Sequence, residues 1–331
     1  MSTRFPDVET VASALALANR APSVHNVQPW QWRVGDESLH LYADPTRRLV
    51  HTDPDGRDMT VSCGVALNHC VIALAALGWQ SKVHRLPNPA DPSHLAAVEL
   101  QPYAADEVDV TLAAAIPRRR TDRRYFSGWP VPHGDISLMG ARAARTGVTM
   151  RRVEPSTALR AALAQAVWQH ATDRQYLDEL TTWSGRYAST AGVPARNIPD
   201  SNPYSPLPSR LFAGAALAQP FEASATDDHG VLLALGTAAD DDLARLRAGE
   251  ATSLVLLTAT ALGLASCPIT EPLEVAATRD AIRMDAFGDE QFPQMLLKVG
   301  WAPVNADPLP STPRRSLDEV VTRLDGSRFV Y

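Results

Sequence analysis

The organisation of this chain follows from the stretch Gly64-Val-Ala-Leu-Asn-His-Cys-Val-Ile-Ala-Leu-Ala-Ala-Leu-Gly-Trp-Gln-Ser81 and its counterpart Gly249-Glu-Ala-Thr-Ser-Leu-Val-Leu-Leu-Thr-Ala-Thr-Ala-Leu-Gly-Leu-Ala-Ser266. The two align without gaps at a constant offset of 185 residues, with Gly, Ala, Ala-Leu-Gly and Ser at matching positions. Each is apolar nearly all round and ends in Leu-Gly, which is typical of a buried helix with a glycine C-cap. The match favours an internal duplication over a chance likeness between two alanine-rich core helices.

A repeat of this length is not that of a solenoid, and it predicts two pseudo-equivalent halves, at residues 1–116 and 117–331. Apolar periodicity predicts helices at 7–20, 56–77, 106–115, 132–145, 156–171, 173–182, 240–262, 272–285 and 316–323. Alternating or continuous apolar runs predict strands at 30–34, 38–42, 80–84, 97–100, 231–235 and 294–299, the first two joined by a hairpin turn. The expected fold class is α+β, with mixed sheets and long core helices.

Composition places the chain among ordinary globular proteins. It has 331 residues, of which 45% are hydrophobic and 21% charged, and its net charge is −6. No uncharged apolar run of about 18 residues and no N-terminal leader pattern is visible, so we expect a cytoplasmic protein that does not enter a membrane. Its three cysteines, Cys63, Cys70 and Cys267, form no CxxC pair and predict reduced core residues instead of a disulfide framework or a zinc site.

Five arginines and one hydroxyl occur within seven residues in the run Arg118-Arg-Arg-Thr-Asp-Arg-Arg124, directly after Pro117. Nucleic-acid binding needs a positive field over a whole face, which an acidic chain does not provide. One small phosphate monoester fits better, because arginine gives planar bidentate hydrogen bonds to phosphate oxygens and the threonine hydroxyl adds a neutral donor. A solvated charge run remains the alternative.

Two further polar motifs lie near the ends of the chain. The first is Arg20-Ala-Pro-Ser-Val-His-Asn-Val-Gln-Pro-Trp30, which offers short polar groups on an irregular loop. The second is Thr312-Pro-Arg-Arg-Ser-Leu-Asp-Glu319, in which Ser316 and Glu319 predict a capping box just after two arginines. The basic tail and the arginine run could meet on one phosphate. Taken singly, each motif is equally well explained as a helix cap or a solvated turn.

The least regular segment runs from residue 183 to residue 230. Prolines at positions 194, 199, 203, 206, 208 and 220 exclude a continuous helix or a central strand there. Loops of this length are usually functional lids or disordered linkers. Aromatic and apolar residues inside the segment favour a lid that packs on something.

Together these pieces resemble the flavin-dependent nitroreductase family, and more closely its fused Acg-type branch. The segment Arg119-Arg-Thr-Asp-Arg123 is similar to the Arg-x-Ser-x-Lys/Arg motif that binds the FMN phosphate, and Pro22-Ser-Val-His-Asn-Val-Gln-Pro-Trp30 to the Pro-Ser-x-x-Asn-x-Gln-Pro-Trp flavin loop. The passage Ala261–Ile269 resembles the helix-to-loop passage over the isoalloxazine, and the tail arginines resemble the basic pair that completes the phosphate site.

The resemblance implies a nitroreductase-like fold and a set of FMN-binding residues: Ser23, Val24, His25, Asn26, Arg119, Arg120, Thr121, Arg123, Pro268, Ile269, Thr270, Glu271, Arg314 and Arg315. Ordinary family members are homodimers with two sites, each built from both subunits. Here the phosphate motif occurs only in the second half and the flavin loop only in the first. The expectation is therefore one composite site in a monomer that mimics a dimer.

In such a protein the flavin carries the chemistry. The resemblance implies hydride transfer from NAD(P)H to nitro or quinone compounds, with no catalytic side chain and no metal, and Asp53-Pro-Asp-Gly56 is better explained as a turn and helix cap than as a calcium loop. No Asn-x-x-Lys flavin contact is evident in the second half. If the segment 183–230 closes over the ring, the alternative is a stress-type protein that sequesters or stores FMN with little turnover.

Overall fold

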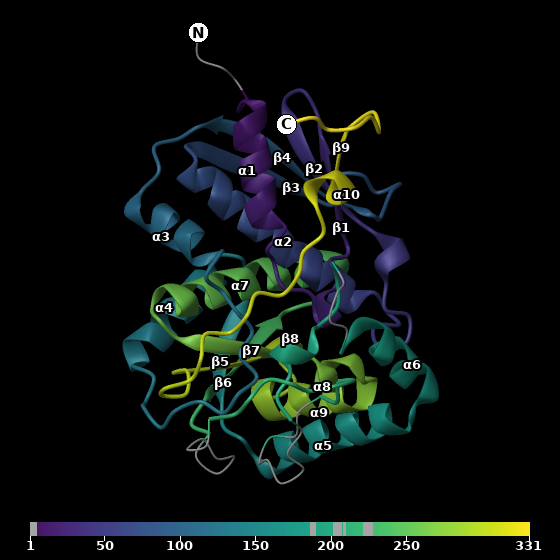
Figure 1. The fold of residues 1–331 in the computed structure, drawn as a ribbon, viewed down its shortest axis with the longest axis vertical. Coiled ribbons are helices and arrows are strands. Elements are labelled where there is room, and N and C mark those ends of the chain that lie inside the picture. Colours follow the sequence, from purple (N-terminus) through teal and green to yellow (C-terminus); the bar gives the residue numbers. More distant parts are fainter. Residues whose placement is uncertain (1–4, 186–189, 201–206, 208–209, 221–227) are drawn as a thin grey trace.

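The structure is a computed structural model that describes residues 5–185, 190–200, 207, 210–220 and 228–331. Its first half has the order α1 (Val8–Ala18), η1 (Val24–Asn26), β1 (Trp30–Val34), β2 (Ser38–Ala43), η2 (Pro45–Arg47), α2 (Arg57–Ala76), β3 (Trp79–Arg85), β4 (His94–Pro102) and α3 (Glu107–Ala115). In Figure 1 these elements form the upper part of the molecule, with a sheet packed against helices on the side that faces the lower part.

The second half forms the lower part in Figure 1. Its order is α4 (His133–Ala144), β5 (Thr149–Val153), α5 (Thr157–Thr172), α6 (Arg174–Trp183), η3 (Ala195–Asn197), β6 (Val231–Thr237), α7 (Asp242–Ala261), β7 (Ala265–Ile269), α8 (Glu271–Glu274), α9 (Ala276–Phe287) and β8 (Phe292–Gly300). The chain ends with α10 (Leu317–Val320) and β9 (Val321–Arg323). The α+β class predicted from the sequence is confirmed.

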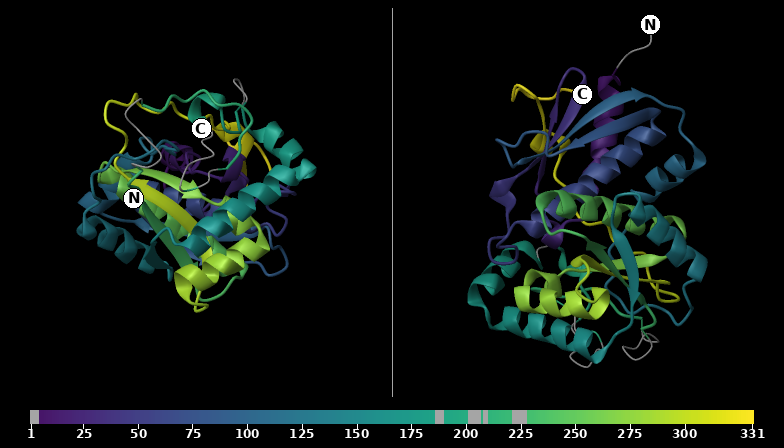
Figure 2. Two further views of the ribbon diagram at one scale, coloured as in Figure 1. Left: turned by 90° about the horizontal axis from the view of Figure 1, so that it is seen from below. Right: turned by 180° about the vertical axis from the view of Figure 1, so that it is seen from behind.

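Helices α2 and α7 cross between the two parts, as the view from behind in Figure 2 shows. The offset of 185 residues seen in the sequence separates both their first and their last residues. They approach so closely that a Cβ on Gly64 would lie 2.1 Å from the carbonyl oxygen of Leu246, and one on Gly249 would lie 2.1 Å from that of Val61. Glycine is required at both positions because the backbones themselves are in contact.

The two sheets have matching strand orders. Strand β3 follows α2 in the chain and strand β7 follows α7. Starting from these two strands, one sheet has the order β3-β4-β2-β1-β9 and the other has the order β7-β8-β6-β5. The pairs β3·β4, β4·β2 and β2·β1 are antiparallel, and so are β7·β8, β8·β6 and β6·β5. Each half thus contributes four antiparallel strands in one spatial order.

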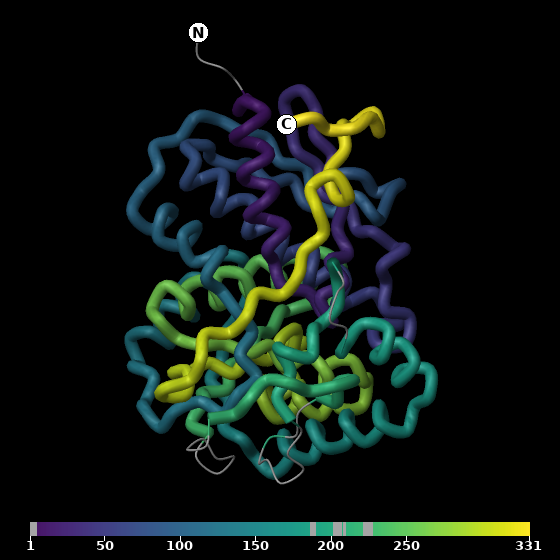
Figure 3. The backbone as a smooth tube through the Cα atoms, viewed as in Figure 1, coloured from purple at the N-terminus to yellow at the C-terminus, as the bar shows by residue number. Residues whose placement is uncertain are grey.

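The C-terminal segment leaves β8 and crosses to the upper part, where β9 pairs with β1 in parallel. The tube in Figure 3 shows this segment in yellow, running from the lower sheet to the upper one. The predicted helix 316–323 is therefore wrong beyond residue 320. The capping box of Ser316 and Glu319 does start a helix, but the helix lasts only four residues before the backbone becomes extended at Val321.

Three other expectations need correction. The predicted helix 272–285 is two helices, because Val275 between α8 and α9 is extended. The predicted helix-to-loop passage contains strand β7, and β5 was not predicted. Helix α2 does meet the length and hydropathy of a membrane span, with a mean hydropathy of 1.7, but 78% of its apolar window is buried inside the protein. Its apolar surface serves the protein core.

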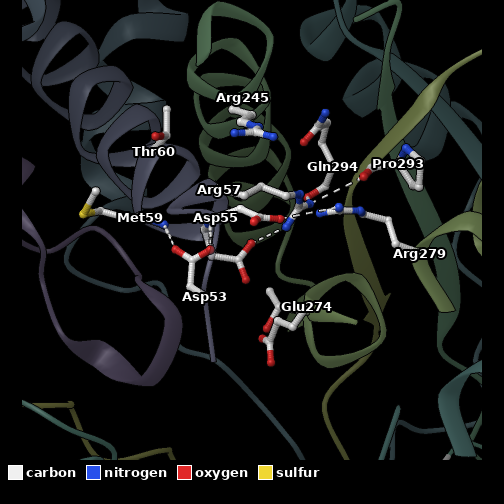
Figure 4. A network of polar contacts seen from close by, with 12 residues as sticks. Asp53, Asp55, Arg57, Met59, Thr60, Arg245, Glu274, Arg279, Pro293 and Gln294 are labelled. Carbon is white, nitrogen blue, oxygen red and sulfur yellow. Dashed lines mark hydrogen bonds and ion pairs between the residues drawn. The ribbon is translucent and has the colours of Figure 1, made fainter. Parts of the chain in front are cut away.

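A buried polar network fixes the start of α2 against the second half (Figure 4). The carboxylate of Asp53 accepts hydrogen bonds from the backbone N–H groups of Asp58 and Met59, at 3.1 and 2.8 Å. The guanidinium of Arg57 pairs with Asp58 and donates to the carbonyl oxygen of Gln294 on β8. The predicted helix cap at Asp53-Pro-Asp-Gly56 is present, and among the described residues no group of three or more acidic, His or Cys side chains could hold a metal ion.

Candidate functional site

A large cavity, with a volume of about 300 Å³, draws its walls from distant parts of the chain. The first half contributes the loop before β1 and the first two turns of α2. The second half contributes the end of the arginine run, the passage after β7 and part of the segment 183–230. Of the residues predicted from sequence, this cavity is lined by Ser23, Val24, His25, Thr121, Arg123, Pro268, Ile269, Thr270 and Glu271.

The loop before β1 has an unusual backbone. His25, Asn26 and Gln28 have φ angles of 48°, 53° and 55°, in the left-handed region that non-glycine residues rarely adopt. Such conformations persist only where the surroundings impose them, and they concentrate at ligand sites. Ser23 contributes to the restraint, because its hydroxyl accepts a hydrogen bond of 2.9 Å from the backbone N–H of Gln28.

Asn26 belongs to this loop but does not line the large cavity. Its side-chain amide donates to the carbonyl oxygens of Gly192 and Pro313, each at 3.0 Å, so it connects the loop to the segment 183–230 and to the C-terminal tail. Gln28 acts in the same way, because it donates to the carbonyl of Thr190 at 3.1 Å and accepts from the backbone N–H of Arg315 at 2.8 Å. These two amides hold the loop in its strained form.

A second, small cavity of about 20 Å³ lies beside the first, and Thr121 lines both. Four arginines surround it: Arg20, Arg119, Arg120 and Arg314. The two basic clusters predicted to meet on one phosphate are thus brought together, with Arg314 from the tail. Arg20 was not predicted, although it directly precedes the flavin loop motif.

These arginines have no carboxylate partner among the described residues. Their hydrogen bonds go to backbone carbonyls, for example from Arg120 to Pro117 at 2.7 Å and from Arg314 to Arg20 at 2.9 Å, and to two hydroxyls. Arg119 donates to the hydroxyl of Thr121 at 3.4 Å, and Arg314 donates to that of Thr312 at 2.6 Å. The Nε atoms of all four are buried without an acceptor. Burial, reinforced by the neighbouring guanidinium charges, lowers the pKa of Arg119 to about 10 and that of Arg314 to about 9. An anion in this cavity would relieve the repulsion and satisfy the free donors.

Two other predicted arginines lie elsewhere. Arg123 lines the large cavity, where its guanidinium is 5.0 Å from the ring centroid of Phe212 and donates to the carbonyl of Asn197 at 3.3 Å. Arg315 lines neither cavity. It is 9% exposed, pairs with Asp44 at 3.6 Å and donates to the carbonyls of Gln28 and Glu319 at 3.2 and 2.8 Å.

The passage from Cys267 to Pro272, which runs from the end of β7 into α8, forms one wall of the large cavity. Cys267 is only partly buried, so the prediction that all three cysteines are core residues is wrong for this one, while Cys63 and Cys70 are buried. Burial raises the pKa of the Cys267 thiol. At the end of the passage, Glu271 contacts the Nδ1 atom of His170 at 3.1 Å.

The segment 183–230 also provides walls that sequence reasoning did not assign. The cavity is lined by Ile198, Pro199, Asp200, Leu207, Arg210, Leu211, Phe212, Gly214, Ala215 and Gln219. Arg210 is 10% exposed and pairs with the fully buried Glu274. No local pattern marks Arg210, whereas Leu211 and Phe212 are among the apolar and aromatic residues on which the prediction of a packed lid depends. Two other aromatic residues of that set, Tyr187 and Tyr204, lie outside the described residues.

Comparison with known proteins gives consistent matches. Residues 116–301 match the model of the "Nitroreductase family". Of the curated Mycobacterium tuberculosis H37Rv proteins, "Putative NAD(P)H nitroreductase Rv3131" is 63% identical over 97% of this chain and 93% of its own length. "Putative NAD(P)H nitroreductase acg" is 35% identical over 94% and 95%. A crystal structure of the FMN-dependent nitroreductase NfnB from Mycobacterium smegmatis with NADPH is similar, with a TM-score of 0.39, 18% identity, and coverage of 66% of this chain and 99% of that one.

Proposed function

This chain belongs to the nitroreductase family, and we propose that it is an FMN-binding, NAD(P)H-dependent oxidoreductase that acts on nitro or quinone compounds at one composite site. The observation that carries this proposal is the pair of adjoining cavities. One is small and surrounded by unpaired arginines, and the other is larger, with walls that are both apolar and polar. A phosphate attached to a planar ring system has the matching shape and charge.

The donor set fits this cofactor. Arg20, Arg119, Arg120 and Arg314 would hold the phosphate, together with the Thr121 hydroxyl at the junction of the cavities. The ring would lie in the larger cavity, between the loop before β1 and the passage that follows β7. When bound, FMN supplies the hydride-transfer chemistry, and the protein supplies binding, orientation and exclusion of water. The nicotinamide reductant is proposed from the names of the curated relatives.

We also propose that the chain is an internal duplication that functions as a monomer with a single site. The equal offset of α2 and α7 and the matching strand orders of the two sheets support this. The small cavity takes Arg119 and Arg120 from the second half and Arg20 from the first. The first half contains no arginine run that could build a reciprocal site.

A second candidate function is FMN sequestration, with the segment 183–230 acting as a lid. It is favoured by Leu211 and Phe212, two described residues of this segment that line the large cavity. A cavity of about 300 Å³ is at the lower limit of ligand pockets. A bound flavin ring would then leave little room for a stacked nicotinamide or nitroarene unless these residues moved.

One experiment separates the two functions. The purified chain is assayed for its flavin-to-protein ratio and is then mixed anaerobically with NADPH or NADH while the oxidised flavin band is recorded. One FMN per chain with rapid bleaching supports the reductase. The same content with bleaching only by dithionite supports sequestration, and the absence of bound or bindable FMN rejects both.

A further inference from the structure

His25 lies at the wall of the large cavity with one ring nitrogen free. Its side chain is buried, with 5% of the residue exposed, and its backbone is held at a φ of 48°. The Nδ1 atom is itself buried and has no hydrogen-bond partner among the described residues. A buried polar atom without a partner is costly, and here it belongs to a residue in a strained conformation that lines a cavity.

The other ring nitrogen is occupied. A guanidinium nitrogen of Arg210 lies 2.6 Å from Nε2 of His25. Arginine can only donate hydrogen bonds, so Nε2 must accept and cannot carry a proton. The proton of a neutral His25 ring is therefore on Nδ1.

Arg210 is itself fixed by two other groups. Its guanidinium donates to the hydroxyl of Thr270 at 3.1 Å and pairs with the carboxylate of Glu274, which has no exposed side-chain surface. Thr270 directly follows β7 and Glu274 is the last residue of α8, whereas His25 belongs to the loop before β1. Arg210 thus fixes the orientation of the His25 ring, in the first half, relative to the second half.

The remaining surroundings keep His25 neutral. The edge of Phe212 approaches its ring, with centroids 6.1 Å apart, and the charges that act on it are those of Arg210, Arg123 and His170. Burial, followed by the charge of Arg210, lowers the pKa of His25 well below its ordinary value. Among the described residues no carboxylate contacts His25.

The geometry points to a specific role: Arg210 holds His25 as the Nδ1–H tautomer, and once a ligand in the cavity displaces the groups that cover Nδ1, this N–H is a neutral hydrogen-bond donor to an acceptor oxygen or nitrogen on a planar, electron-poor ring. This inference rests on the proposed function for the kind of ring. The ring can be that of the flavin or that of an aromatic nitro or quinone substrate, because both carry acceptors of the same chemistry. Arg210 acts through His25 and is a positioning residue.

The consequence is chemical as well as geometric. A neutral imidazole N–H polarises an acceptor atom and stabilises partial negative charge on it, but it keeps its proton. His25 cannot relay a proton inward either, because its second nitrogen faces a permanent cation. Any proton taken up in the proposed reaction must reach the cavity by another route.

The tautomer can be measured on the protein as purified. Long-range proton–nitrogen NMR spectra of protein labelled with ¹⁵N-histidine are recorded from pH 5.5 to 8.5, with His25→Gln identifying the resonances. The neutral Nδ1–H form is expected throughout in the wild type and in Arg210→Lys, which keeps a cationic donor. In Arg210→Met the two tautomers should mix and the ring should titrate nearer its ordinary range. An Nε2–H ring or a charged His25 at pH 7 in the wild type would overturn the inference.

Binding measurements identify the acceptor. FMN is titrated into flavin-free protein, and nitrobenzene into the oxidised, flavin-loaded protein, for the wild type, His25→Gln and His25→Leu. Loss of one hydrogen bond should weaken binding roughly 2- to 10-fold in His25→Leu, and His25→Gln should restore part of it. An effect on FMN alone assigns the acceptor to the flavin, and one on nitrobenzene alone assigns it to the substrate. If neither FMN binding nor nitrobenzene binding changes, the donor role is rejected, even when NADPH reduces the flavin. If NADPH does not reduce the flavin, that result counts only against the proposed activity.

Discussion

The arginines near the ends of the chain separate into two kinds by their partners. At the small cavity Arg119 is buried and Arg314 is half-buried, and neither contacts a carboxylate among the described residues, whereas Arg315 is bound to Asp44 and to two carbonyls. The first kind carries unsatisfied donors and positive charge, which destabilise the protein without a ligand. The second kind is already satisfied. Substitution of an arginine of the first kind should therefore weaken anion binding and leave folding intact, whereas substitution of Arg315 should weaken folding and affect anion binding much less.

Arg119→Ala is expected to lower FMN affinity roughly 10- to 100-fold, because charge-assisted hydrogen bonds to a phosphate contribute about 1.5 to 3 kcal/mol. Unfolding of the flavin-free protein should be unchanged or shifted to higher denaturant, since one buried charge is removed. Flavin content after dialysis and urea unfolding are the two measurements. Arg118→Ala is the control, because Arg118 is exposed and, among the described residues, its side chain bonds only the carbonyl of Ala114.

Arg315→Ala should lower stability more than it lowers flavin affinity. It removes the cation beside the buried Asp44 and two hydrogen bonds, so we expect a loss of about 2 to 4 kcal/mol in unfolding free energy. Flavin affinity of the molecules that remain folded should change much less than in Arg119→Ala. A variant with normal stability and no flavin would instead assign Arg315 directly to the phosphate site.

Asp53 makes stability depend on pH. Burial, and secondly the charge of Asp58, raises the pKa of Asp53 to about 6, against the opposing effect of its two backbone N–H bonds. A raised carboxyl pKa means that the folded state binds more protons than the unfolded state between about pH 4 and 6. Its contribution to stability therefore falls as pH rises through this range.

The corresponding experiment compares wild type and Asp53→Asn by urea unfolding at pH 5 and pH 8. The Asp53 contribution to the unfolding free energy should decrease by roughly 1 to 2 kcal/mol between these pH values in the wild type and should be absent from the variant. Parallel pH profiles for the two proteins would show that Asp53 does not titrate in this range.

Residues could be predicted from the sequence where a short motif marks them. Ser23, His25 and Thr121 belong to such motifs and line the large cavity. Arg210 could not be found in this way, since its place depends on how an irregular segment packs, and Phe212 was predicted only as a packing residue of the segment 183–230. Asn26 and Arg315 belong to motifs too, but the structure places them in contacts that support the loop before β1.

At the scale of elements, the crossing of α2 and α7 tolerates no side chain at Gly64 or Gly249, because the two backbones are in contact there. Gly64→Ala should destabilise the protein by about 3 kcal/mol, because the new methyl group would meet the backbone carbonyl of Leu246 and neither helix can withdraw alone. Gly134→Ala in α4 is the matched control, since nothing lies within 4 Å of its Cβ position. It should be neutral or stabilise by roughly 0.5 kcal/mol. Thermal unfolding of both variants tests the contact, and equal melting temperatures would contradict it.

Elements with strong local periodicity were predictable, and those defined by distant partners were not. Helices α2 and α7 carry long apolar runs and appear within a residue or two of the expected bounds. Strand β9 has only three residues, and its partner β1 lies almost three hundred positions earlier. Strand β7 contains Pro268, whose missing N–H argues locally against a strand, although the ladder with β8 tolerates it.

At the scale of the whole molecule, the proposal of an internal duplication predicts a monomer. Sedimentation equilibrium should give a mass near 35.8 kDa, with one FMN per chain. Conditions that dissociate ordinary dimers, such as strong dilution, should leave flavin content unchanged. A stable species of twice this mass, or two flavins per chain, would contradict the proposal.

The path of the C-terminal tail also determines when the site can exist during synthesis. Arg20 and Arg314 are separated by 294 positions in the chain, so they leave the ribosome at different times, yet they stand at one cavity of about 20 Å³. Until β9 emerges, β1 is an unpaired edge of the upper sheet, open to association with other chains. Loading of the proposed cofactor would therefore be a late step in the synthesis of this protein, because a nascent chain interrupted before the tail lacks both strand β9 and a complete anion site.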